Sequence, residues 1–335
     1  MSGESRSRRR RDRPPVLGIE GLTIEFAWRR GAARVVDDVT LEVWPGEIVG
    51  LIGESGSGKT MTALSVLGLL PRTATITTGD IRLSGTSLLG LSRAQLRAIR
   101  GQHIAMIPQN PMSALNPVLR VGAQVGEPYV LHRQATWRAA LQQAIRRLAD
   151  VHLPFPDERA REYPHQFSGG MQQRSMTAMA IALEPPLLVA DEPTTALDVT
   201  IQAQILRLLR EIRDEHHTSI LFITHDLAVV AEMCDWVYVM YAGRILEQGS
   251  VERIFARPGH PYTQALLRAT PTTETAQAEL LSIPGSIPSP VDLPRGCRFV
   301  DRCQYRFDHC NEEPPLLAVE TDHTARCWLL ETVHG

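Results

Sequence analysis

The chain has 335 residues, of which 43% are hydrophobic and 21% charged, and its formal net charge at pH 7 is -2. This composition is ordinary for a globular protein, and the small net charge gives no reason to expect nucleic acid as a partner. No apolar run reaches the roughly 20 residues of a membrane-spanning helix. The best candidate, residues 220–240, is interrupted by His225, Asp226, Glu232 and Asp235. We therefore expect other subunits to carry any membrane role.

Residues 1–15 are rich in arginine. We expect a disordered basic tail here, because the residues that follow lack the apolar segment that completes a signal peptide. Weak attraction of the tail to anionic lipid headgroups is the alternative.

The first half of the chain is predicted to mix strands and helices. Alternation of apolar and polar residues predicts antiparallel strands at residues 17–26 and 35–43. Periodicity and proline positions then predict, in chain order, a strand at 47–53, a helix at 59–70, a helix at 92–100, a strand at 104–107 and a helix at 136–149.

In the second half of the chain, predicted helices and strands alternate more regularly. The predicted elements are a helix at 168–183, a buried strand at 187–190, a helix at 201–215, a buried strand at 219–224, a helix at 227–233 and a hairpin at 236–247. Such alternation predicts an α/β fold with a largely parallel sheet, which the antiparallel strands at the start make mixed. From residue 258 the sequence becomes proline-rich and irregular and contains four cysteines, which predicts a small C-terminal extension.

A glycine-rich segment after the strand at 47–53 matches the phosphate-binding pattern G-x-x-x-x-G-K-[ST], which requires a strand before it and a helix after it. Its glycines let backbone N–H groups converge on phosphates, and the helix N-terminus adds a favourable dipole. Lys59, the only lysine of the chain, is predicted to reach the β- and γ-phosphates, and Thr60 to ligate Mg²⁺. The chain is thus predicted to be a P-loop NTPase that binds ATP through Gly53, Glu54, Ser55, Gly56, Ser57, Gly58, Lys59, Thr60 and Met61.

The buried strand at 187–190 delivers two carboxylates, Asp191 and Glu192, at its C-terminal end, where open α/β sheets bind ligands. Asp191 is predicted to hold Mg²⁺, and Glu192 to orient or deprotonate the attacking water. Such a pair is a weak signal by itself, but together with the P-loop it predicts an ATPase site.

Residues 167–172, FSGGMQ, resemble the signature sequence of ABC proteins, usually LSGGQ. Ser168 can cap the helix that begins here, and the glycines let the backbone approach an anion. The resemblance implies that the nucleotide contacts Ser168, Gly169, Gly170 and Met171.

Further positions follow in the order that ABC proteins show. Gln109 resembles the Q-loop glutamine, which implies contact with nucleotide and Mg²⁺, and residues 196–198 resemble the D-loop, with Asp198 near nucleotide. His225 resembles the switch histidine, so that Glu192, His225 and Lys59 are the predicted catalytic residues. Phe26, with Trp28 as the alternative, stands where an aromatic ring stacks on adenine.

Three longer segments narrow the resemblance: residues 109–117, 163–166 and 260–267 are similar to the ATP-binding subunits of oligopeptide, dipeptide and nickel importers, nearest to the D-type subunits of dipeptide permeases. The similarity extends over roughly residues 17–330, although Asn110 replaces a common Asp. It implies a nucleotide-binding domain at residues 16–257, with a helical subdomain at about 105–185, and a peptide-importer-type C-terminal domain at 258–335.

The resemblance also implies an ATPase that energises uptake of a solute, first of all di- or oligopeptides, with nickel, opines or oligosaccharides as alternatives. The implied partners are a second ATP-binding subunit, usually a paralogue, two transmembrane permease subunits, and an extracytoplasmic solute-binding protein. The chain is then peripheral, at the cytoplasmic face of the bacterial inner membrane. In such complexes two ATP molecules lie between the ATP-binding subunits, so Ser168 is expected to serve the partner's nucleotide. The Gln109 loop and the helical region after it are expected to meet the membrane subunits.

The chain has five cysteines. Cys234 is predicted to be an inert core residue. The others, Cys297, Cys303, Cys310 and Cys327, lack the close C-x₂₋₄-C pairs typical of zinc sites, and disulfides do not suit the reducing cytosol. Four thiolates at wider spacing suit an iron–sulfur cluster, and the resemblance to peptide importers implies a [4Fe-4S] cluster. Zinc, disulfides and free thiols remain the alternatives.

The sequence argues against two other classes of function. A non-transport ABC ATPase usually carries a long coiled-coil insertion or two ATPase domains, and neither pattern is present. An iron–sulfur regulatory module with a vestigial nucleotide site is disfavoured because Lys59, Asp191, Glu192 and His225 are all intact.

Overall fold

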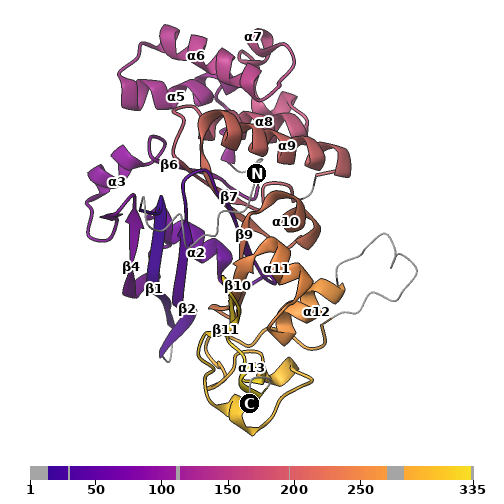
Figure 1. The fold of residues 1–335 in the computed structure, drawn as a ribbon. Coiled ribbons are helices and arrows are strands. Elements are labelled where there is room, and N and C mark those ends of the chain that lie inside the picture. The colour runs from indigo at the N-terminus through magenta and orange to yellow at the C-terminus, as the bar shows by residue number, and fades with distance from the viewer. Residues whose placement is uncertain (1–13, 29–30, 111–113, 196, 270–282, 333–335) are drawn as a thin grey trace. The chain divides into compact units, whose positions relative to one another are not determined.

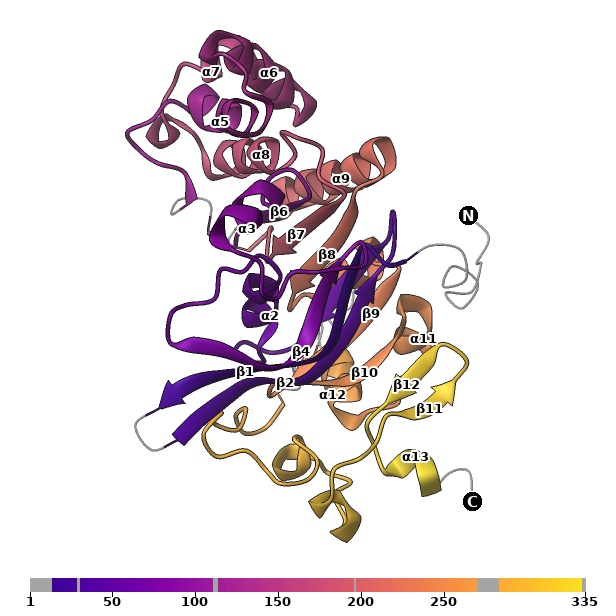
Figure 2. The same cartoon turned by 90° about the vertical axis from the view of Figure 1, so that its left-hand side faces the viewer.

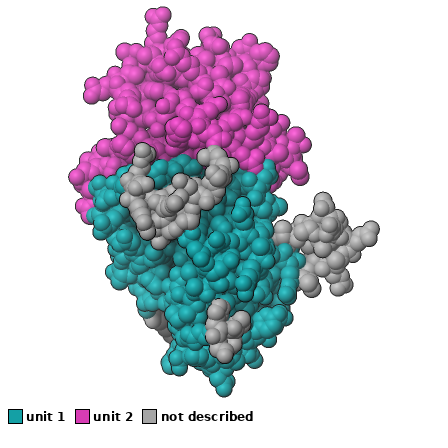
Figure 3. Space-filling model, in the orientation of Figure 1, with its two compact units in different colours: residues 1–89, 223–335 teal, residues 90–222 magenta. Residues whose placement is uncertain are grey.

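The computed structural model describes residues 14–28, 31–110, 114–195, 197–269 and 283–332 (Figure 1). The predicted basic tail lies almost entirely outside these residues, as does Ala196 of the predicted D-loop. The chain divides into two compact units, residues 1–89 with 223–335 and residues 90–222 (Figure 3). Among the helices within the described ranges, none is long and apolar enough to cross a bilayer.

The first unit contains a four-stranded antiparallel sheet. Strand β1 (Leu17–Trp28) lies between β2 (Gly31–Val43) and β4 (Ala74–Leu83), and the short β5 (Thr86–Ser87) pairs with β4. Burial alternates toward the end of β2, where Val39, Leu41 and Val43 are buried, because side chains along a strand point to opposite faces. In β1, by contrast, consecutive residues at 17–19 and 22–24 are buried. Figure 2 shows β1 and β2 as a long hairpin.

The first unit also contains strands of a second sheet, in the order β11-β12-β10-β9-β3. Strand β3 (Ile48–Ile52) runs parallel to β9 (Trp236–Tyr241), and β9 pairs antiparallel with β10 (Arg244–Ser250). Two strands from the end of the chain, β12 (His323–Ala325) and β11 (Leu317–Glu320), extend this order antiparallel (Figure 2). This sheet is therefore mixed because of β10, β12 and β11. The prediction that the antiparallel strands at the start of the chain make it mixed is wrong, since β1 and β2 belong to the separate four-stranded sheet.

The helices in the described part of the first unit are α2 (Lys59–Val66), α10 (Leu227–Met233), α11 (Val251–Ala256), α12 (Pro261–Ala269) and α13 (Leu329–Thr332). Helix α12 has proline at its first position, where the missing N–H costs nothing. Tyr262 of α12, Phe299 and Cys297 share one hydrophobic core with Ile52 of β3 and Tyr241 of β9. The C-terminal segments thus pack into the same core as the strand before the P-loop.

The second unit combines β6 (Ile104–Ile107), β7 (Leu187–Asp191) and β8 (Ser219–Thr224), which continues into the first unit at residue 223. Strands β6 and β7 are parallel and almost fully buried. The helices are α3 (Arg93–Ile99), α5 (Val121–Arg133), α6 (Trp137–Asp150), α7 (Pro156–Arg159), α8 (Gly169–Ala180) and α9 (Val199–His216). Helices α5, α6 and α8 pack against one another, and Gly126 allows a close approach, since a Cβ there would lie 3.1 Å from the Ala140 oxygen.

Most predicted elements are present, with ends that differ by a few residues. The structure adds β4, β5, α5 and the C-terminal elements, which the sequence patterns did not predict. Helix α5 contains Pro128 and two glycines, Gly122 and Gly126, which weaken the helical signal in the sequence. The predicted helix at 59–70 ends at Val66, because the chain turns at Gly68 with a positive φ of 61°.

Candidate functional site

The P-loop, residues 53–60, connects β3 to α2 in a conformation that only glycine allows at two of its positions. Gly53 and Gly58 have φ values of 152° and 109°. A Cβ at Gly53 would lie 2.0 Å from the Met240 carbonyl oxygen, and a Cβ at Gly58 would lie 2.6 Å from that of Val35. The loop therefore packs closely against β9 and β2. Gly53 and Gly58 are required both because a Cβ would clash there and because of their positive φ.

Lys59 is buried at the start of α2, with 5% of its surface exposed. Its Nζ donates to the carbonyl oxygens of Gly53 at 2.7 Å and Glu54 at 2.9 Å. The ammonium thus lies along the inner side of the loop that precedes it. An ammonium at that position, beside a helix N-terminus, can attract a phosphate group.

In the second unit, β7 ends at Asp191, which is 2% exposed. Glu192 follows with a left-handed backbone, φ 47°, stabilised by a hydrogen bond from the Thr195 N–H to its carbonyl oxygen. Its carboxylate accepts hydrogen bonds from Gln109 Nε2 at 2.8 Å and Thr195 Oγ1 at 2.9 Å. The structure therefore brings together Gln109 and Glu192, two residues that the sequence placed in one site, and adds Thr195.

The two other predicted positions of this unit are helix caps. Ser168 caps α8 by accepting a hydrogen bond from the Met171 N–H at 3.4 Å, as the sequence predicted. Asp198 caps α9 by accepting one from the Ile201 N–H at 2.9 Å. Gly169 is exposed, while Gly170 approaches Ile201 so closely that a Cβ would lie 3.0 Å from its side chain.

His225 is exposed directly after β8, in the first unit. The turn beyond it is fixed on both sides, because the Asp226 N–H donates to Thr224 Oγ1 and the Asp226 carboxylate caps α10. Of the two candidate adenine-stacking rings on β1, Phe26 is half-buried, whereas Trp28 is 62% exposed. Both remain predictions for contact with adenine.

Sequence reasoning missed two residues that hold the P-loop from the C-terminal part of the chain. Tyr262 Oη accepts a hydrogen bond of 2.9 Å from the Glu54 N–H. Arg302 Nη1 donates to the Glu54 carboxylate at 2.8 Å. Tyr262 belongs to a segment quoted for the family resemblance, but no spacing in the sequence links either residue to position 54.

Four cysteines line one small cavity in the first unit: Cys297, Cys303, Cys310 and Cys327. His260 also lines it, and its Nε2 is buried without a hydrogen-bond partner. Cys234 lies elsewhere, against Gly50 of β3. In the described part of the chain the five cysteines form no disulfide, and no three or more His, Cys, Asp or Glu side chains are close enough together to hold a single metal ion. The cavity volume is about 10 Å³, the space of one water molecule.

Burial disfavours the thiolate form of three of these cysteines. It raises the pKa of Cys297 to about 11 and that of Cys327 to about 12, and it also raises the pKa of Cys303. Binding of a metal or cluster by these side chains would have to release their protons.

Comparison with known proteins places these features in a family. The ABC transporter family matches residues 36–195, and the family described as oligopeptide/dipeptide transporter, C-terminal region, matches residues 246–310. The oligopeptide transport ATP-binding protein OppD of Salmonella typhimurium is 44% identical over 93% of both chains. The dipeptide transport ATP-binding protein DppD of Bacillus subtilis is 45% identical over 94% of both.

Solved structures agree with these matches. An ATP-binding cassette solved as a dimer in a post-hydrolysis state with ADP and phosphate superposes with a TM-score of 0.64. It is 26% identical and covers 70% of this chain and 98% of its own. The predicted ABC ATPase fold with a mixed sheet is thereby confirmed, and so is the predicted relationship to peptide importers. The chain belongs to the ATP-binding proteins of ABC transporters, in the group that carries the oligopeptide/dipeptide transporter C-terminal region.

Proposed function

We propose that this chain is the ATP-hydrolysing subunit of an ABC importer that takes up di- or oligopeptides. The observation that carries the proposal is the P-loop, in which Gly53 and Gly58 are sterically required and the Lys59 ammonium lines the inner side of the loop. The names of the relatives, an oligopeptide and a dipeptide transport protein, support peptides as the solute.

The residues of the two units have distinct roles in this proposal. The P-loop N–H groups and Lys59 bind the phosphates of ATP, and Thr60, Asp191 and Gln109 hold Mg²⁺, which neutralises charge on the phosphates. Glu192 acts on the attacking water as base or positioning group, and His225 stabilises the transferred phosphoryl group. Phe26 or Trp28 stacks on adenine.

Ser168, Gly169, Gly170 and Met171, with Asp198, serve nucleotide held by a second ATP-binding subunit, which we propose to be a paralogue. An exposed Ser168 and Gly169 at the start of α8 support a surface that receives a ligand from outside. Two permease subunits and an extracytoplasmic binding protein complete the complex, with this chain peripheral at the cytoplasmic face of the inner membrane. We also propose that the chain consists of a nucleotide-binding domain at 16–257 and a C-terminal domain at 258–335.

Uptake by cells tests this function. Cells lacking the chain are expected to lose uptake of labelled di- and tripeptides, and the wild-type chain restores it whereas Glu192→Gln does not. Uptake of nickel and of a labelled oligosaccharide is measured in parallel. If cells lacking the chain take up peptides normally but lose uptake of nickel or of the oligosaccharide, that solute and not a peptide is the one transported. Normal uptake of all three solutes would contradict an importer function.

We further propose that the cysteine-rich C-terminal extension holds a [4Fe-4S] cluster through Cys297, Cys303, Cys310 and Cys327. Four soft thiol donors around one cavity, beside an unpartnered buried His260 nitrogen, fit the donor set of such a cluster. The cavity is small, so the cysteine side chains have to turn outward to admit it. When bound, the cluster supplies a redox centre and iron–thiolate bonds that cross-link this segment.

Anaerobically purified protein is then expected to be brown, with about four irons per chain. Cys310→Ser removes a soft ligand and lowers colour and iron together, while Cys234→Ser changes neither. Stoichiometric zinc without iron would favour the zinc alternative, and four titratable thiols with no metal would contradict both.

A further inference from the structure

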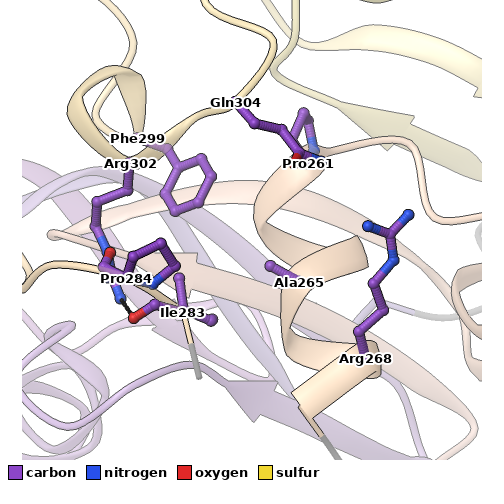
Figure 4. Close-up of a pocket in the computed structure, with 8 residues that line it drawn as sticks. All are labelled: Pro261, Ala265, Arg268, Ile283, Pro284, Phe299, Arg302 and Gln304. Carbon is purple, nitrogen blue, oxygen red and sulfur yellow. Dashed lines mark hydrogen bonds between the residues drawn. The ribbon is translucent and has the colours of Figure 1, made fainter. Parts of the chain in front are cut away.

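The Arg302 side chain, in the C-terminal extension, donates four hydrogen bonds. Arg302 ends the short 3₁₀ helix Val300–Arg302, directly before Cys303, and its side chain is 6% exposed. Nε donates to the Pro284 carbonyl oxygen at 2.8 Å, and Nη2 donates to that of Ile283 at 3.1 Å. Figure 4 shows the guanidinium turned toward these two carbonyls. Two backbone carbonyls therefore fix its direction.

The remaining nitrogen, Nη1, reaches the P-loop. It donates to Glu54 Oε2 at 2.8 Å and to Tyr241 Oη at 3.3 Å. A guanidinium has a planar fork of donors, so fixing two of its nitrogens also fixes the third. The position of the Glu54 carboxylate is thus set by the backbone at residues 283 and 284.

The backbone of Glu54 is held as well. Its N–H donates to Tyr262 Oη at 2.9 Å, so this N–H points toward α12. Its carbonyl oxygen accepts a hydrogen bond from Lys59 Nζ at 2.9 Å. The same oxygen also accepts a hydrogen bond of 3.2 Å from the Ser57 N–H within the P-loop. Glu54 therefore connects the C-terminal extension, through its N–H and carboxylate, with the P-loop lysine, through its carbonyl oxygen.

Aromatic packing makes this connection rigid. The Tyr241 and Tyr262 rings lie 4.6 Å apart, and each is 5.3 Å from the ring of Phe299. The Arg302 guanidinium lies 5.7 Å from the centre of the Tyr241 ring and 5.8 Å from that of Phe299. Cation–π contacts at such distances add to the hydrogen bonds in holding a guanidinium in place.

The simplest alternative is that Arg302 only anchors the C-terminal extension. Its bonds to the Ile283 and Pro284 carbonyls are sufficient for that role. The ion pair with Glu54 is not needed for that role, yet it joins the buried Arg302 side chain to a partly exposed carboxylate inside the P-loop. Lys59 donates to the Glu54 carbonyl oxygen. An ion pair that fixes Glu54 therefore also affects how well the loop is arranged to bind phosphate.

We propose that Arg302 is a positioning residue of the ATPase, which acts through Glu54 to hold the P-loop in the conformation that binds the phosphates of ATP. The inference rests on the proposed role of residues 53–60 in binding ATP. Neither residue has to touch the nucleotide, because the effect passes through the Glu54 backbone to Lys59. The C-terminal extension therefore contributes to ATP binding through Arg302.

A double-mutant cycle tests this, with the affinity of the isolated chain for ATP as the readout. Arg302→Met and Glu54→Gln are each expected to weaken binding about tenfold, and the double variant also about tenfold rather than about a hundredfold, since the two residues act as one unit. Arg302→Lys keeps a charge beside Glu54 and recovers part of the affinity. Arg306→Met, an exposed arginine of the same segment, is the matched control and is expected to bind ATP within about twofold of wild type.

Thermal unfolding and iron content of each variant separate this role from an anchoring role. Folded Arg302→Met protein with normal ATP affinity, or effects of Arg302→Met and Glu54→Gln that multiply, would overturn the inference. If Arg302→Met does not fold, Glu54→Gln and Tyr262→Phe still decide, because both leave the anchor to residues 283 and 284 intact. A Lys59→Ala variant with unchanged affinity would instead overturn the proposed nucleotide site itself.

Discussion

Gln109 Nε2 donates a hydrogen bond of 2.8 Å to Glu192 Oε2, across 83 positions of the chain. The same oxygen accepts from Thr195 Oγ1. Both hydrogen bonds engage one oxygen of the Glu192 carboxylate, Oε2. Gln109 and Thr195 therefore fix the orientation of the Glu192 carboxylate.

Glu192→Gln is expected to abolish ATP turnover while ATP binding persists, because the amide cannot accept a proton but leaves the P-loop unchanged. ATP should then trap closed dimers, which size-exclusion chromatography measures. Turnover within about twofold of wild type would remove Glu192 from its proposed role.

Lys59→Arg is expected to cause a severe loss of hydrolysis. The buried ammonium fits between the carbonyl oxygens of Gly53 and Glu54, and a planar guanidinium is larger and cannot keep that geometry. Steady-state phosphate release measures the effect. Near-normal activity would show that Lys59 does not act at the phosphates.

Ser168→Arg tests the shared site. Ser168 is exposed at the start of α8, so a long cation there is expected to leave ATP binding by the isolated chain nearly unchanged but to prevent function of the assembled complex. Losing the cap costs about 1 kcal/mol of stability, which thermal unfolding can verify. A collapse of ATP binding in the isolated chain would contradict the assignment of Ser168 to the partner's nucleotide.

The stability of the fold is expected to fall as the pH is lowered from about 6.5 toward 4. Burial lowers the pKa of His260 from 6.5 to about 4, although the nearby Glu247 carboxylate opposes this. In this window the unfolded chain binds a proton at His260 and the native chain does not, so acid favours unfolding by up to about 3 kcal/mol. Urea unfolding at pH 7 and pH 4.5 measures the difference.

His260→Asn is the matching variant, because its side-chain oxygen can still accept from the Tyr262 N–H as His260 Nδ1 does. It should show a smaller loss of stability between the two pH values. An identical pH dependence in the variant would exclude His260 as the source.

The local geometry of the P-loop, of the Asp191–Glu192 pair and of the Ser168 cap could be predicted because it depends on short segments of sequence. The P-loop requires glycines at fixed positions before a lysine, and Asp191 and Glu192 follow an unmistakably apolar strand. Ser168 is a standard N-cap residue, so its role in α8 could also be foreseen. Each of these features depends on neighbours within a few residues.

The strands and long-range contacts within the C-terminal extension could not be predicted in the same way. Strands β11 and β12 have only four and three residues, too few for an alternating pattern to be visible. The bond from Arg302 to Glu54 joins positions 248 residues apart, and an arginine beside a cysteine gives no signal for it. Thr195 reaches Glu192 only because of the left-handed turn at that residue, which the sequence does not specify.

The pairing of β12 with β10 has a consequence for any shortened form of the chain. Residues 247–249 of β10 pair with 323–325, and the Arg326 N–H donates to the Leu246 carbonyl oxygen. A protein ending at residue 257 would expose this row of backbone donors and acceptors to other molecules. An unpaired edge strand of this kind can pair with strands of neighbouring copies. Truncation is therefore expected to cause aggregation and not to yield a soluble minimal ATPase.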